Sequence, residues 1–277
     1  MKLWRAWSTL VILSFRRLLW SANTLMIAFP IGGCLLFLLR RRFGQSAGAD
    51  ASGSFSESFV EEFDLFSGQF VVVVFASFIV PIVALAYATT SIGGDREDRT
   101  LLFLLVRPIP RALIVLGKFG ATLPLVVGIT MGSFYIYCSM AGDVGRLALE
   151  LYLPGVFCMT IAYACLFHLF AVVFRHATIV ALVYALFIEF FLGNMPGVIK
   201  RLTVSYYGRS IIYYYQDYQL QLMSRAVPTI RDVDSPYPQW FEPISAHAAG
   251  AMLLTIAGVS LAAALVIFHR REYRDLA

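Results

Sequence analysis

Charged residues are scarce in this sequence, and their scarcity excludes an ordinary water-soluble globular protein. Only 14% of the 277 residues are charged, whereas 59% are hydrophobic and the mean hydropathy is +0.75. Soluble proteins are about a quarter charged, so too few polar residues are present to cover a soluble fold. The apolar residues form long unbroken runs, whereas a transmembrane barrel shows short alternating segments. The sequence therefore predicts an all-α, polytopic membrane protein with a single membrane domain over residues 1–277.

Motifs that bind metals or nucleotides are missing as well, and their absence argues against an enzyme. All four cysteines lie inside apolar runs and none forms a C-x-x-C pair, so we expect neither a disulfide framework nor a metal site. No G-x-x-x-x-G-K-S/T phosphate loop and no H-E-x-x-H zinc motif occurs in the sequence. We therefore predict that the chain has no catalytic residues, binds no cofactor and does not hydrolyse ATP itself.

Residues 2–18 are predicted to form an amphipathic helix that lies in the membrane surface. At about 100° per residue, two tryptophans and several aliphatic residues share one face, and Lys2, Arg5 and Arg16 lie on the opposite face. The alternative is an irregular start to the first span.

Six apolar runs follow, each long enough to cross a bilayer. They lie at about 19–39, 69–88, 113–137, 149–173, 178–196 and 248–268.

The basic residues predict that both termini face the cytoplasm. In this orientation the inner side holds 13 of the 22 Lys and Arg residues but only 5 of the 17 Asp and Glu residues. Cytoplasmic loops of membrane proteins carry an excess of Lys and Arg, so the count favours this arrangement.

In this orientation the segment 197–247 forms an outer loop. Six of its tyrosines lie between positions 206 and 218, and we expect Ile211–Arg225 to form an interfacial or re-entrant helix.

The connector 93–112, GGDREDRTLLFLLVRPIPRA, is both strongly charged and rich in leucine. Asp95 is a suitable helix N-cap, and acidic residues in a first turn suit the positive end of the helix dipole. Arg107 precedes Pro108, and residues before proline avoid the helical conformation. We therefore predict a short helix over Arg96–Val106, charged at its start and apolar at its end. Because so short a helix is unstable alone, we expect it to be held against another surface.

This connector resembles the first cytoplasmic connector of type-2 ATP-binding-cassette (ABC) exporter permeases. That family shows an acidic and basic cluster, then Thr-Leu, a leucine run, a proline with a basic residue, and a later Gly-Lys. The matching positions are Asp95, Arg96, Glu97, Thr100, Leu101, Leu104, Leu105, Arg107, Pro108, Arg111, Gly117 and Lys118. Arg99 stands where a glycine is usual. The amphipathic amino-terminal helix, the six spans and the long segment before the last span also resemble the family's layout.

The resemblance implies an exporter subunit that lacks an ATPase site of its own. Two permease chains, identical or related, would cross the inner (cell) membrane and bind separate ATPase subunits that hold the ATP; no nucleic acid is implied. The short helix would be a cytoplasmic coupling helix that docks on the ATPase and carries its movement into the spans. The residues expected to contact the ATPase are Asp95, Arg96, Glu97, Asp98, Arg99, Thr100, Leu101 and Leu102.

Two ionisable residues lie inside the predicted spans, Glu189 in the fifth and His168 in the fourth. A charged residue at the bilayer centre costs about 2.5–3.5 kcal/mol on insertion scales, so both are candidates for the translocation path, and Glu189 also for proton exchange. The alternatives are a neutral carboxyl, a hydrogen bond from Tyr184 or His168 to Glu189, and a packed core histidine. A membrane-embedded enzyme or a secondary transporter that uses this pair, or a scaffold that anchors a partner, are the other hypotheses for function.

Overall fold

The computed structural model describes residues 2–19, 31–33, 55–97, 110–226 and 236–270. Within these ranges every regular element is a helix, which confirms the predicted all-α membrane fold. Five helices are long and apolar enough to cross a membrane: Phe59–Arg96, Ala112–Met140, Asp143–Val173, Ala177–Asn194 and Ala246–Arg270. They correspond to the predicted spans from 69–88 onward. The predicted first span, 19–39, lies mostly outside the described residues.

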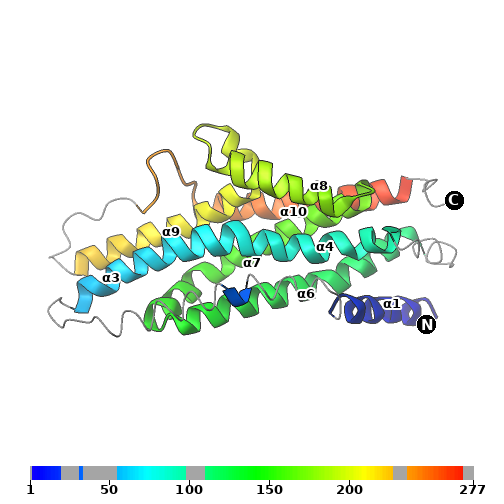
Figure 1. The fold of residues 1–277 in the computed structure, drawn as a ribbon, viewed down its shortest axis with the longest axis horizontal. Coiled ribbons are helices and arrows are strands. Elements are labelled where there is room, and N and C mark those ends of the chain that lie inside the picture. Colours follow the sequence, from blue (N-terminus) through cyan, green and yellow to red (C-terminus); the bar gives the residue numbers. More distant parts are fainter. Residues whose placement is uncertain (1, 20–30, 34–54, 98–109, 227–235, 271–277) are drawn as a thin grey trace.

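The predicted span at 69–88 is the middle of a much longer helix. The helix begins as α3 (Phe55–Leu65), continues as the π-helical segment η1 (Phe66–Ile79) and ends as α4 (Val80–Glu97) (Figure 1). Its apolar part, Phe59–Arg96, has 38 residues. At about 1.5 Å per residue this part alone spans about 57 Å, whereas the hydrocarbon core of a bilayer is about 30 Å thick. The helix therefore projects beyond the membrane.

The prediction that a new helix begins at Asp95 is wrong, because α4 continues through this residue to Glu97. Asp95 and Arg96 are each only 5% exposed and bond to other helices of the bundle. Capping preferences are local and weak, and tertiary contacts readily override them. The predicted coupling helix over Arg96–Val106 otherwise lies outside the described residues.

α6 (Arg111–Met140) and α7 (Asp143–Val173) form an antiparallel pair joined by a tight turn. Gly142 in this turn has a φ of 73°, a left-handed conformation that glycine adopts without strain. At Gly145 a Cβ would lie 1.9 Å from the carbonyl oxygen of Cys138. The absence of a side chain at Gly145 therefore lets the first turn of α7 pass close to the end of α6.

The last two apolar runs form the outer helices of the bundle. They are α8 (Ala177–Val183) with the π-helical η2 (Tyr184–Phe191) and the 3-10 helix η3 (Leu192–Asn194), and then α10 (Ala246–Arg270). α7 is the central helix and packs against α4, α6 and α10 (Figure 1). Large apolar side chains on the outer helices are exposed, among them Phe187 at 64% and Val259 at 69%. Such faces suit contact with lipid chains.

The segment 197–247, predicted as an outer loop, contains a long packed helix. After the 3-10 helix η4 (Ile199–Leu202), α9 (Val204–Ala226) runs for 23 residues and is longer than the predicted Ile211–Arg225. α9 and α7 pack closely, and each helix has a glycine at the contact. A Cβ on Gly155 of α7 would lie 2.7 Å from Ile211 Cγ2, and a Cβ on Gly208 of α9 would lie 2.3 Å from the sulfur of Met159.

Several tyrosines of α9 pack inside the protein, and the interfacial placement of this helix stays a prediction. Tyr206, Tyr207 and Tyr213 are 0%, 7% and 7% exposed, and aromatic rings, Phe241 among them, pack against them. Tyr214 and Tyr218 remain exposed. Composition could not separate the two placements, because a tyrosine ring suits either one once its hydroxyl has a partner.

α1 (Lys2–Leu19) confirms the predicted amino-terminal helix; its position in the membrane surface stays a prediction. It packs along α6 at the end of the bundle where α10 also ends, and α3 lies at the opposite end (Figure 1). Leu18 borders the same cavity as Lys118, near the start of α6. Tyr137, near the end of α6, donates a hydrogen bond to the carbonyl of Ile31 (2.7 Å). The described residues on either side of 20–30 therefore lie at different ends of α6.

Candidate functional site

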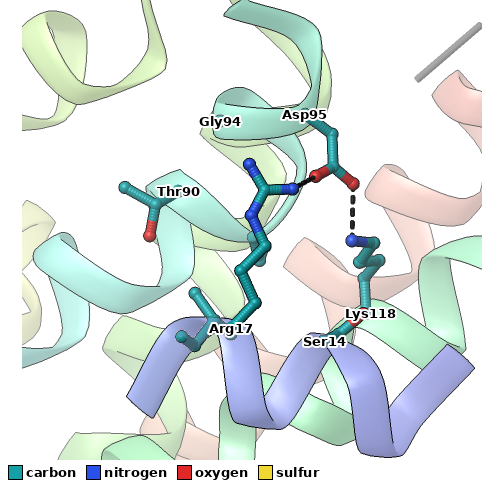
Figure 2. A pocket seen from close by; sticks show the side chains of 8 residues that line it. Ser14, Arg17, Thr90, Gly94, Asp95 and Lys118 are labelled. Atoms are coloured by element: carbon teal, nitrogen blue, oxygen red, sulfur yellow. Dashed lines mark hydrogen bonds and ion pairs between the residues drawn. The ribbon is translucent and has the colours of Figure 1, made fainter. Parts of the chain in front are cut away.

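A three-residue ionic cluster lies where α4 leads into the connector (Figure 2). The Asp95 carboxylate, in the last turn of α4, is bound through Oδ1 by the Arg17 guanidinium and through Oδ2 by the Lys118 ammonium, each at 2.5 Å. The side chains of Asp95 and Lys118 are 7% and 8% exposed, whereas that of Arg17 is 52% exposed. One carboxylate thus joins α1, α4 and α6 at the base of the connector.

A cavity of about 180 Å³ lies beside this cluster, between α1, α4 and α6. Its lining residues are Ser14, Arg17, Leu18, Thr90, Ser91, Gly94, Asp95 and Lys118. The Asp95 oxygens point at the two cations, and the Thr90 and Ser91 hydroxyls donate to carbonyls of their own helix. The described residues contain no group of three or more His, Cys, Asp or Glu side chains that could hold a metal ion. The cluster therefore joins helices, and it offers no evident chemistry.

Arg96 connects the same end of α4 to α7. Its guanidinium donates a hydrogen bond to the carbonyl of Phe174 (3.2 Å), the C-cap residue that follows α7. Asp95 and Arg96 were predicted to contact an ATPase, and both are buried and bonded within the chain. The ATPase contact stays a prediction for these two residues and for Glu97, whose backbone ends α4. The other expected contact residues, Asp98, Arg99, Thr100, Leu101 and Leu102, lie outside the described residues.

Glu189, the predicted intramembrane acid, is 3% exposed and accepts four hydrogen bonds. The hydroxyls of Tyr184 (2.7 Å) and Tyr163 (2.8 Å) donate to Oε1 and Oε2 respectively. The backbone N–H of Val204 donates to Oε1 (3.0 Å) and that of Ser205 donates to Oε2 (2.9 Å). The bond from Tyr184, one of the alternatives for Glu189, is thus present, and sequence reasoning missed the other three donors.

These bonds place the Glu189 carboxylate at the amino terminus of α9. The first N–H groups of a helix have no partner within the helix and carry its positive dipole end, so a carboxylate there is stabilised. The Thr203 hydroxyl accepts a further N–H, that of Tyr206 (3.2 Å), as an N-cap. Arg209, one turn further on, donates to Asn194 Oδ1 (2.8 Å) and to the carbonyl of Gly193 (3.0 Å). The predicted fifth span (178–196), which we call span five, and α9 are therefore joined end to end.

His168 is a packed core residue of α7 that bonds to α4. Its Nδ1 lies 3.1 Å from the hydroxyl oxygen of Ser91, and its ring centroid lies 5.2 Å from that of Phe119. Within the described residues no hydrogen bond or ion pair joins His168 to Glu189, whose four donors all come from other residues. The geometry therefore gives no support to a catalytic or proton-transfer pair. The role of either residue in a translocation path stays a prediction.

Comparison with known proteins places the chain in a family. Residues 6–273 match the family model described as ABC-2 family transporter protein. A stretch of 61 residues is 43% identical to the probable ABC transporter permease protein NosY of Pseudomonas aeruginosa and covers 21% of this chain and 22% of that protein. That alignment reaches less than a quarter of the curated relative, whereas the family model spans nearly the whole chain. The chain belongs to the ABC-2 family of transporter proteins and is a membrane subunit of an ABC transporter.

Proposed function

We propose that this chain is the permease of an ATP-driven exporter, and that connector 93–112 couples it to a separate ATPase subunit. Family membership and the absence of a phosphate loop in the sequence support a division of labour between two kinds of subunit. The permease acts with a second permease chain, identical or related, in the inner membrane. Its termini and the connector face the cytoplasm, in agreement with the excess of Lys and Arg on that side.

The observation that carries the coupling proposal is the bonding at the end of α4. A connector transmits movement only when its base is fixed to the spans that must move. Asp95 joins α4 to α1 and α6, and Arg96 joins it to α7. All of these bonds lie within two residues of Glu97, where α4 ends. A displacement applied to the connector therefore reaches four helices together.

Charge reversal at Glu97 and Asp98 tests the docking step. We expect the double variant E97R/D98R to reduce the amount of ATPase that co-purifies by about tenfold or more. The reversed charges would face like charges on the ATPase, and such a juxtaposition across an interface costs several kcal/mol. The measurement is co-purification of the ATPase with tagged permease from its native membrane, normalised to the permease recovered.

The matched control is E61R/E62R, which reverses two exposed acidic residues on α3, at the opposite end of the bundle (Figure 1). We expect this variant to retain wild-type association and membrane insertion. Undiminished recovery of the ATPase with E97R/D98R, or an equal loss with the control, contradicts docking through the connector.

A further inference from the structure

Lys200 is a buried cation that is held by aromatic rings. It lies in η4, just before α9, and is 5% exposed. Its ammonium donates a hydrogen bond to the carbonyl of Trp240 (2.5 Å). The same nitrogen lies 5.3, 5.8 and 5.9 Å from the ring centroids of Phe241, Trp240 and Tyr206. Among the described residues no carboxylate forms an ion pair with it.

This arrangement is an ammonium-binding site in chemical terms. An aromatic ring attracts a cation placed within about 6 Å of its centroid, and the attraction grows as water is removed. A buried ammonium without partners is strongly unfavourable, so the rings and the carbonyl must compensate for the lost hydration. Tyr206 and Phe241 are themselves 0% and 1% exposed, so little water reaches the rings around the ammonium. We call Tyr206, Trp240 and Phe241 the ammonium cage.

Lys200 and the ammonium cage together join three segments of the chain. Lys200 follows span five, Tyr206 belongs to α9, and Trp240 and Phe241 belong to residues 236–245, which lead directly into α10 and which we call the strap. The strap has no regular secondary structure. It is held on α9 by the hydrogen bond from the Tyr206 hydroxyl to the carbonyl of Glu242 (2.8 Å) and by ring contacts of Phe241. Lys200 thus ties the end of span five to the chain that enters α10.

An apolar side chain would fill the same space without the penalty of a buried charge. A lysine in this position binds strongly when the cage is closed, and it is well hydrated as soon as the cage opens. The contact between Lys200 and the rings is therefore strong when the cage is closed and is replaced by hydration when the cage is open. Such a contact suits a segment that opens and closes. Arg209 also lies over Phe241 (6.0 Å), but its other bonds fix it to Gly193 and Asn194, so it is a permanent support.

We propose that Tyr206, Trp240 and Phe241 form a binding site for an ammonium group, that Lys200 is its built-in ligand, and that this pair is the latch which closes the strap over α9. The latch opens when the permease opens at the end of the bundle away from α1. The opening step rests on the proposed transport function, whereas the binding of the ammonium group does not.

Hydrogen exchange with chemical rescue tests the latch on the full-length permease in lipid nanodiscs, without ATPase or nucleotide. In Lys200→Ala we expect the strap amides to exchange about tenfold faster than in wild type. A suitable reporter is the N–H of Phe241, which donates to the carbonyl of Pro238 (2.7 Å). Adding n-butylammonium, which reproduces the lysine side chain, restores slow exchange, and neutral n-butanol does not. The control Arg201→Ala, which removes the exposed neighbouring cation, exchanges like wild type.

Two results overturn the ammonium site. One is wild-type exchange in Lys200→Ala, and the other is equal rescue by butanol, which would mean that the side chain only fills space. Lys200→Arg provides a second variant that keeps the cation, and we expect its exchange to stay within about threefold of wild type.

A second measurement tests the opening step separately. In the wild-type complex of permease and ATPase trapped with ATP, we expect the strap amides to exchange about tenfold faster than in the nucleotide-free complex. Unchanged exchange overturns the gating role of the latch. Failure of the proposed function would appear differently, as the absence of any ATPase that binds the permease.

Discussion

Two buried carboxylates, at different levels of the bundle, are stabilised by different kinds of partner. Asp95 is bound by two cations, Arg17 and Lys118, that come from other helices. Glu189 is bound by two tyrosine hydroxyls and by two backbone N–H groups of α9. Both carboxylates join elements that are distant in sequence, but only the first is joined by formal charges.

The difference in partners separates a joint with one half-exposed partner from a joint whose donors are all at least partly buried. Arg17 is half exposed, so water can replace Asp95 as its partner at small cost. The donors to Glu189 belong to a helix terminus, to the buried Tyr163 and to the partly buried Tyr184, and water replaces them less readily. The Arg17 contact is therefore the weak part of the Asp95 joint, whereas the buried Lys118 contact and the Glu189 joint hold their helices firmly.

Removing Glu189 is expected to have the largest effect on stability. In Glu189→Ala, two backbone N–H groups and two tyrosine hydroxyls lose their acceptor, and unsatisfied buried donors cost about 1–3 kcal/mol each. We expect the free energy of unfolding to fall by about 3–5 kcal/mol in total, since part of the loss is recovered by relaxation. Thermal and urea unfolding of the purified permease measure this loss.

The control for this variant is Glu150→Ala, which removes an exposed carboxylate from α7. Substitutions at such surface positions usually change stability by about 0.5 kcal/mol or less. A loss at Glu189 no larger than that at Glu150 would contradict an anchoring role and leave the carboxylate free for a different one.

A double-mutant cycle between Asp95 and Lys118 is expected to give an intermediate effect. Both side chains are buried, so Asp95→Ala leaves the Lys118 ammonium uncompensated, and we expect a coupling energy of about 2–3 kcal/mol. The measurement uses the unfolding free energies of D95A, K118M and the double variant. Additive losses in the double variant would show that the two groups do not depend on each other.

Arg17→Gln is expected to have the smallest effect, because the guanidinium is half exposed. A loss of about 0–1 kcal/mol is typical of such pairs. Since salt screens exposed charges over about 10 Å at 0.1 M, the loss should shrink further at 1 M salt, whereas the Glu189→Ala loss should not. A salt-independent loss at Arg17 as large as that at Lys118 would remove the distinction between the two joints.

Local patterns predicted the membrane helices well and the polar sites poorly. The runs at 113–137, 149–173 and 248–268 lie within long helices because hydropathy and helix length are properties of contiguous residues. The partner of Asp95 could not be predicted in this way, since Arg17 lies 78 positions away. Glu189 was identified as unusual from its place in an apolar run, and Tyr184, five residues further back in the same run, was expected as one of its partners.

The sequence by itself determined that the chain is an all-α membrane protein with an amphipathic start, and its connector already resembled one family of permeases. Hydrophobicity and helical periodicity suffice for this, because each is read along the chain. Only the tertiary structure decided that Asp95 belongs to α4, that Glu189 caps α9, and that Lys200 sits among aromatic rings. Those facts depend on which distant segments meet, because a buried charge is stable only where the folded chain brings its partners within a few ångströms.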